Sequence, residues 1–215
     1  MKTIIFDLDG VLFDTERYYF QFGKEAIEEM GYTPTDEVVL NLRSLAHKLA
    51  KSYVKDRYGE EFDLDDFRAR RREKLDAFYE VYGIPVKPEV EATLAKLKAR
   101  GNEVAAATAN PLERAKQMLQ DTGLGSYFSH VLSSWEVANG KPAPDVYLDA
   151  CQKLGRAPEE CYAVEDSPNG VRAASDAGCK TIMIVDLTDS TPELDRRIVG
   201  KIYKFSEVLS VVDEK

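Results

Sequence analysis

Short apolar segments alternate with longer segments of helical periodicity through most of this chain, and this alternation restricts the fold more than any other feature. The apolar runs cover residues 3–6, 103–107, 130–132, 161–164 and 181–185. Helical periodicity covers residues 88–100, 111–122, 144–154 and 168–177. Continuous apolar runs suit parallel strands that are buried on both faces. The pattern predicts an α/β fold with a doubly wound parallel sheet.

Residues 15–86 interrupt this alternation. They contain no convincing strand, and their apolar residues share helical faces, as Ala26, Ile27 and Met30 do. Pro85 and Pro88 mark the return to the alternating pattern. We therefore predict a core domain made of residues 1–14 and 87–215, with residues 15–86 inserted as a helical cap domain.

Composition and charge exclude several classes of protein. Hydrophobic residues make up 44% of the chain, but no apolar run approaches the ~20 residues that span a bilayer. A formal net charge of -9 argues against nucleic acid as a partner. The three cysteines form no close pair, which is typical of free thiols in a reducing compartment. We expect a cytoplasmic monomer that binds neither nucleic acid nor a membrane.

Two carboxylates close the first apolar run. Asp7 and Asp9 are two residues apart, so a strand projects both to the same side. Ligands of open α/β sheets bind beyond the carboxyl ends of the strands. An acidic turn is the structural alternative. A calcium loop is rejected because its glycine comes later and it lies between helices.

Polar residues also follow other predicted strands. Thr108 ends the second apolar run, Lys141 lies in a stiff Gly-Lys-Pro turn, and Glu165 and Asp166 close the fourth run. Each has a structural alternative, because Thr108 and Asp166 also suit helix caps and most lysines are solvated. Ser167 before Pro168 is a further cap candidate.

Taken together, these side chains match phosphoryl transfer through an aspartyl phosphate. A carboxylate that attacks a phosphate dianion is repelled by it, and a lysine with a magnesium ion can neutralise that repulsion. A second carboxylic acid can protonate the leaving alcohol and then deprotonate water. Magnesium prefers oxygen ligands of the kind present here.

In their order along the chain, these segments resemble the four motifs of the haloacid dehalogenase superfamily. Residues 7–14 match the first motif, Thr108 the second, Lys141 the third, and Glu165 with Asp166 the fourth. The resemblance spans nearly the whole chain, including a helical cap after the first motif. It is greatest to the branch of β-phosphoglucomutases and phosphoglycolate phosphatases, and it implies a Rossmann-like core.

The resemblance also implies a role for each matching residue. Asp7 becomes the nucleophile, Asp9 the general acid and base, and Lys141 the cation that neutralises the nucleophile and the transferring group. Phosphate oxygens are expected to bind Thr108, the amides of Ala109 and Asn110, and Lys141. The magnesium ligands are expected to be Asp7, the backbone carbonyl of Asp9, and Asp166. Glu165 is expected either to be a further ligand or to contact the residues that bind the ion.

The same resemblance leaves two activities open. Mutases of the branch carry a histidine where this chain has Tyr19, and a Gly-x-Ser-Arg segment where it has residues 42–47. We therefore predict a phosphatase of a small phosphorylated metabolite, such as a sugar phosphate, with a hexose-phosphate mutase as the alternative. A binding protein without activity is disfavoured because the acidic residues of the motifs are all present.

The basic run of Arg68, Arg70, Arg71 and Arg72 suits a solvated helix face. Arg71, however, falls on the apolar stripe with Phe67 and Phe78, where its stem can be buried with the charge at the surface, or the charge can reach the active-site cleft. Trp135 is expected to pack rather than to stack on substrate.

Overall fold

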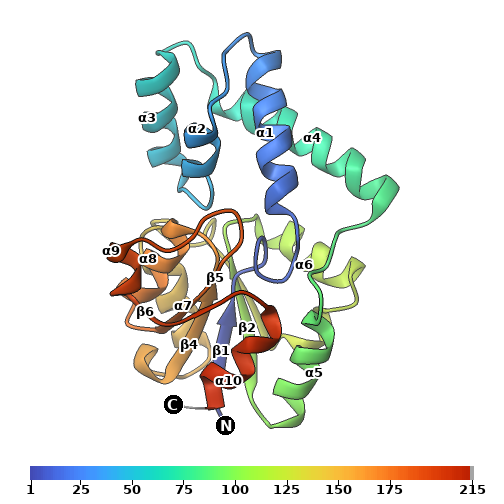
Figure 1. The fold of residues 1–215 in the computed structure, drawn as a ribbon, viewed down its shortest axis with the longest axis vertical. Helices are drawn as coiled ribbons and strands as arrows, with labels where there is room; N and C mark the ends of the chain where they lie inside the picture. Colours follow the sequence, from blue (N-terminus) through green and yellow to red (C-terminus); the bar gives the residue numbers. More distant parts are fainter. Residues whose placement is uncertain (214–215) are drawn as a thin grey trace.

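The computed structural model describes residues 1–213, in which six parallel strands form one sheet with helices on both faces (Figure 1). The strand order is β3-β2-β1-β4-β5-β6. The strands are β1 (Thr3–Phe6), β2 (Glu103–Thr108), β3 (His130–Ser133), β4 (Cys161–Glu165), β5 (Lys180–Ile184) and β6 (Ile198–Ile202). The doubly wound parallel sheet predicted from the sequence is confirmed.

Helices cover both faces of the sheet because successive strand residues point to opposite sides. Ile4 and Phe6 of β1 pack with α5 (Val90–Ala99), α6 (Leu112–Asp121) and α10 (Val208–Asp213). Ile5 packs with α7 (Asp145–Lys153) and α8 (Pro168–Asp176). The short helix α9 (Pro192–Asp195) adjoins α8. No helix within residues 1–213 is long and apolar enough to cross a membrane.

Strand β6 is the element that the apolar pattern does not predict. It lies at the edge of the sheet and is buried fully only at Ile202. Gly200 and Lys201 interrupt its apolar sequence. An edge strand has one neighbour and more exposure, so it does not need the continuous apolar run of a central strand.

The helices between β1 and α5 form a separate helical unit, which Figure 1 shows above the sheet, beyond one end of its strands. It contains α1 (Glu16–Glu29), α2 (Asp36–Asn41), α3 (His47–Tyr58) and α4 (Leu64–Tyr82). Helix α4 begins after Asp63, whose carboxylate accepts the amides of Asp65 and Asp66. The unit has its own apolar core, drawn from residues 26–67.

Two neighbouring crossings join the helical unit to the core. The amide of Asp14 donates to the Pro85 carbonyl (2.8 Å), and the amide of Lys87 donates to the Leu12 carbonyl (2.8 Å). The unit also contacts the core directly, since the Ala46 amide donates to the Lys141 carbonyl (2.8 Å). The helical unit is therefore docked over the carboxyl ends of the strands.

Candidate active site

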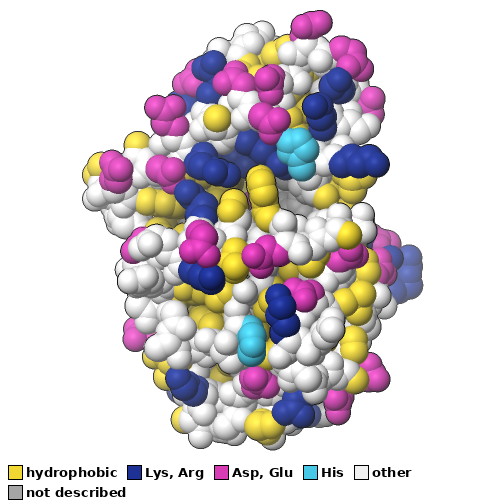
Figure 2. Space-filling view, turned by 180° about the vertical axis from the view of Figure 1, so that it is seen from behind, with side chains coloured by type: hydrophobic (Ala, Val, Ile, Leu, Met, Phe, Trp, Pro, Cys, Tyr) yellow, Lys and Arg dark blue, Asp and Glu magenta, His cyan; other side chains and the backbone are white. Residues whose placement is uncertain are grey.

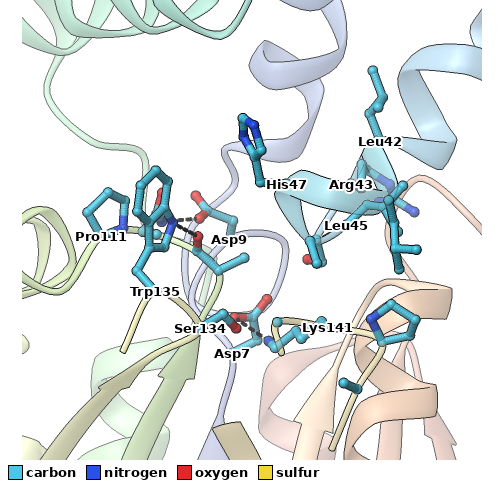
Figure 3. Close-up of a pocket in the computed structure, with 18 of the residues that line it drawn as sticks. Asp7, Asp9, Leu42, Arg43, Leu45, His47, Pro111, Ser134, Trp135 and Lys141 are labelled. Atoms are coloured by element: carbon cyan, nitrogen blue, oxygen red, sulfur yellow. Dashed lines mark hydrogen bonds and ion pairs between the residues drawn. The ribbon is translucent and has the colours of Figure 1, made fainter. Parts of the chain in front are cut away.

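The predicted site residues meet at the carboxyl edge of the central strands. Asp7 and Asp9 follow β1, Thr108 ends β2, and Asp166 follows β4. Strand β1 lies between β2 and β4, which brings these three chain segments together. Lys141 reaches the same place from the loop between β3 and α7 (Figure 3).

Lys141 is fully buried and faces two carboxylates. Its Nζ lies 3.1 Å from Asp7 Oδ1 and 2.6 Å from Glu165 Oε1, and it donates to the Ala107 carbonyl (3.0 Å). Tyr147 Oη donates to the same Glu165 oxygen (2.5 Å). Burial opposes the charge on Lys141, but Asp7 and Glu165 outweigh it and raise the pKa of the ammonium. The protonated, positively charged form of Lys141 is therefore favoured beside Asp7.

Asp9 is held by two hydrogen bonds from other segments. Thr15 Oγ1 donates to its Oδ1 (2.6 Å), and Asn110 Nδ2 donates to its Oδ2 (2.6 Å). Burial raises the pKa of Asp9, while the bonds from Thr15 and Asn110 oppose the rise. A raised pKa favours the protonated form that a general acid needs.

The loop after β2 is organised by hydroxyl groups. Thr108 Oγ1 accepts the amide of Asn110 (3.1 Å), and Ser133 Oγ donates to the Asn110 carbonyl (2.6 Å). Within residues 1–213, the buried hydroxyl of Ser134 has no hydrogen-bond partner, and Ser134 lines the cavity. No role is predicted for Ser134 from the sequence, because a single loop serine carries no signal.

Three buried carboxylates form a cluster that fits a metal ion. Ligand oxygens of Asp7, Glu165 and Asp166 lie within 4.8 Å of one another. Glu165 Oε2 and Asp166 Oδ1 are buried without a hydrogen-bond partner among the described residues. Cβ atoms at Gly10 and Gly170 would collide with the Asp166 and Glu165 carboxylates, so both glycines make room for them. Buried, unpaired carboxylate oxygens suit a hard divalent cation.

The side chain of Asp9 lies outside this cluster. Its predicted contact with the metal therefore stays a prediction about the backbone carbonyl. Burial and the nearby Glu16 raise the pKa of Asp166 well above its usual range, while Arg43 opposes the rise. A bound cation would favour the ionised form instead.

Arg43 is a site residue that was missed from the sequence. It follows α2, and its Nη1 donates to Asp166 Oδ2 (3.0 Å) while Nη2 donates to Thr188 Oγ1 (2.6 Å). Its carbonyl accepts Asn169 Nδ2 (2.9 Å). Burial raises the pKa of Glu16 to about 8, although Arg43 at 3.7 Å opposes this. Arg43 thus joins the helical unit to the carboxylate cluster.

A cavity of about 950 Å³ opens between the helical unit and the core. Figure 3 shows Asp7 and Lys141 at its base, with Trp135 and Arg43 on different sides. Trp135, which was expected to pack rather than to stack on substrate, is not packed among other side chains but lines this cavity and is 60% exposed. Its indole N–H donates to the Ala109 carbonyl (3.0 Å), which holds the ring at the cavity wall.

Known proteins resemble this chain in sequence and in fold. Residues 1–178 match the model of a family described as haloacid dehalogenase-like hydrolase. A phosphorylated carbohydrates phosphatase of Thermotoga maritima is 30% identical, covering 100% of this chain and 99% of the relative. A phosphoglycolate phosphatase of Aquifex aeolicus is 28% identical, and the match covers 85% of this chain and 84% of that phosphatase. The structure of CbbY from Rhodobacter sphaeroides in complex with phosphate has the same fold, with a TM-score of 0.79, 24% identity and 99% coverage of both chains.

Proposed function

The chain belongs to the haloacid dehalogenase-like hydrolases, and from that premise we propose that it is a magnesium-dependent phosphatase of small phosphorylated metabolites such as sugar phosphates. The observation that carries the proposal is the buried Lys141 ammonium at 3.1 Å from Asp7, beside a cluster of acids that fits a metal. The full-length relative named as a phosphatase of phosphorylated carbohydrates supports this substrate class. A monomer in the cytoplasm remains our expectation.

In the first step, an oxygen of Asp7 attacks the phosphorus of the ester. The bond from phosphorus to the ester oxygen breaks, and Asp9 gives its proton to the leaving alcohol. Lys141 offsets the repulsion between Asp7 and the phosphate. Asp7, Asp166, Glu165 and the Asp9 carbonyl would hold a magnesium ion, which would supply further positive charge there. The product is phospho-Asp7.

In the second step, water attacks the phosphorus of phospho-Asp7. Asp9, now ionised, takes a proton from that water, and the bond from phosphorus to the Asp7 oxygen breaks. Inorganic phosphate leaves, and both carboxyl groups return to their starting states. Throughout, Thr108, the amides of Ala109 and Asn110, and Lys141 hold the phosphoryl oxygens.

The helical unit acts as a cap in this proposal, with bounds at residues 15–86. Its hinges are the two neighbouring crossings, Asp14 with Thr15 and Val86 with Lys87 and Pro88. The cap lies over the strand ends, and its closure over a bound substrate would keep bulk water from the reacting groups. The Ala46 amide on the Lys141 carbonyl and Arg43 on Asp166 hold the cap in place.

Transfer of phosphate to water rather than to a sugar hydroxyl separates this proposal from a hexose-phosphate mutase. Tyr19 replaces the mutase histidine, and Arg43, in the segment that supplies the mutase arginine, is already paired with Asp166. We expect phosphorylated metabolites incubated with magnesium to release free phosphate. The panel includes β-glucose 1-phosphate with a trace of the 1,6-bisphosphate, and both free phosphate and glucose 6-phosphate are measured. Rapid glucose 6-phosphate formation with little free phosphate would make the protein a mutase.

Replacing Asp9 with asparagine is expected to slow turnover by about 10²–10⁴-fold, because proton transfer is lost from both steps. The asparagine oxygen can still accept the Thr15 hydroxyl, and the backbone carbonyl is unchanged, so metal binding should persist. Steady-state kinetics and a magnesium titration of thermal stability test the two parts. A near-normal rate in Asp9→Asn would remove Asp9 from the mechanism.

A further inference from the structure

Three arginines of α4 line the cap side of the cavity. Arg68, Arg71 and Arg72 all face it, and we refer to them as the arginine cluster. Arg70, the fourth basic residue of the run, does not line the cavity and pairs with Asp66 at 3.0 Å. Figure 2 shows Lys and Arg side chains around the hollow between the helical unit and the core. A solvated helix face therefore suits Arg70 and also the exposed Arg72, whereas Arg68 and Arg71 are half-buried beside the cavity.

Within residues 1–213, no carboxylate forms an ion pair with any arginine of the cluster, although the charges of Glu16 and Asp9 act on Arg71 from a longer distance and that of Asp65 acts on Arg68. Arg68 instead lies 3.0 Å from His47 Nδ1 and donates to the Leu45 carbonyl (3.3 Å). Burial, and after it the charge of Arg71, lowers the pKa of Arg68 to about 10. For the half-buried Arg68 and Arg71, a charge without a paired anion is unfavourable, and an anion in the cavity would relieve this.

Arg71 is held in position by contacts that leave its charge free. Its guanidinium carbon lies 5.1 Å from the ring centroid of Tyr19 and 5.1 Å from that of Phe67. A Cβ atom at Gly23 would lie 3.7 Å from Arg71 Cδ, so the arginine stem passes close to α1 at this glycine. Aromatic rings orient a guanidinium without neutralising it. The guanidinium of Arg71 is therefore preorganised to bind an anion.

Resting on the phosphatase function proposed above, we infer that the arginine cluster binds a second anionic group of the substrate, either a phosphate or a carboxylate, while the phosphate to be cleaved lies at Asp7. A guanidinium matches both groups through paired N–H donors. The preferred substrates are then bisphosphates or phosphorylated sugar acids. Esters with one phosphate and no other charge bind the same catalytic groups but leave the cluster unpaired.

Three six-carbon esters test the inference because they differ at carbon 1. Glucose 6-phosphate is uncharged there, 6-phosphogluconate carries a carboxylate, and glucose 1,6-bisphosphate carries a phosphate. At least one of the latter two is expected to have a kcat/KM about 10- to 100-fold above that of glucose 6-phosphate. The better of them tells which anion the cluster takes. Equal kcat/KM for all three would overturn the inference.

Substitution of Arg71 assigns the preference to the cluster. Arg71→Gln is expected to lower kcat/KM for the doubly charged ester about 10- to 100-fold, mainly through KM, and to change that for glucose 6-phosphate by less than about 3-fold. Arg71→Lys keeps the charge and should retain part of the preference. Arg70→Gln, on the same helix outside the cavity, is the matched control and should behave as wild type. Equal losses on all three esters in Arg71→Gln would show a structural role and contradict the inference.

Equilibrium binding separates this inference from the phosphatase proposal. An Asp7→Asn enzyme should bind the same three esters without turnover, so calorimetry can compare their affinities. Tighter binding of a doubly charged ester, reduced by a further Arg71→Gln change, supports the cluster even if no ester is hydrolysed by the wild type. Hydrolysis with equal affinities would instead retain the phosphatase and reject the second anion site.

Discussion

Replacing Asp7 with asparagine is expected to reduce turnover by about 10⁶-fold, to the background of the assay, the size of loss seen when a catalytic nucleophile is removed. An amide oxygen is a far weaker nucleophile than a carboxylate, and no other described carboxylate has the same position against Lys141. Glu165 contacts Lys141 too, but Tyr147 already binds the same carboxylate oxygen. Phosphate release under saturating substrate measures the effect.

The control for Asp7→Asn is Asp121→Asn, which changes an exposed carboxylate at the end of α6. It should keep the wild-type rate. Circular dichroism and thermal melting check that both variants fold. An Asp7→Asn enzyme that folds and retains more than about 1% of the rate would exclude Asp7 as the nucleophile, because the residual catalysis of such variants is far smaller.

Removal of divalent cations is the second large effect that we expect. Exhaustive chelation should abolish phosphate release, and magnesium should restore it, because the buried oxygens of Asp7, Glu165 and Asp166 have too few positive partners without a cation. The native state alone holds the assembled site, so magnesium should also raise the melting temperature.

An Asp166→Asn variant separates specific binding from a general salt effect. It removes one charge from the cluster and leaves Arg43 able to donate to the side-chain oxygen. The magnesium-dependent rise in melting temperature should shrink in this variant and persist in Asp121→Asn. Full activity of the chelated wild type would contradict the requirement for a metal.

Much of the core and its site could be predicted from the sequence because parallel strands impose a common edge. Asp7, Thr108 and Asp166 each end or follow a strand, and strands β2, β1 and β4 are neighbours. Short-range rules were enough here: apolar runs mark the strands, and the polar residues after them face the same side of the fold. Ser167 also caps α8 as expected, accepting the Gly170 amide (3.0 Å).

Contacts that depend on how the cap docks could not be predicted in the same way. Arg43 and Asp166 are 123 residues apart, and their ion pair exists only because the loop after α2 reaches the strand ends. Arg71 shares a helical stripe with Phe67, and this pattern allows either a buried structural role or a role in the active site. In the structure, Gly23 and Tyr19 lie beside Arg71, which depends on how α1 packs on α4. Packing was expected for Trp135 because tryptophan is buried on average, whereas here it lines an open cavity.

Trapping of the phosphoenzyme tests the central claim most directly. Wild-type enzyme is mixed with magnesium and its best substrate, quenched in acid within milliseconds, and digested with pepsin at the same low pH, at which an acyl phosphate survives. Tandem mass spectrometry should then find a phosphoryl group on Asp7 in the peptide that contains it, and none in the Asp7→Asn enzyme treated in the same way. Substrate turnover with Asp7 unmodified, or with the phosphoryl group on another residue, would contradict the account.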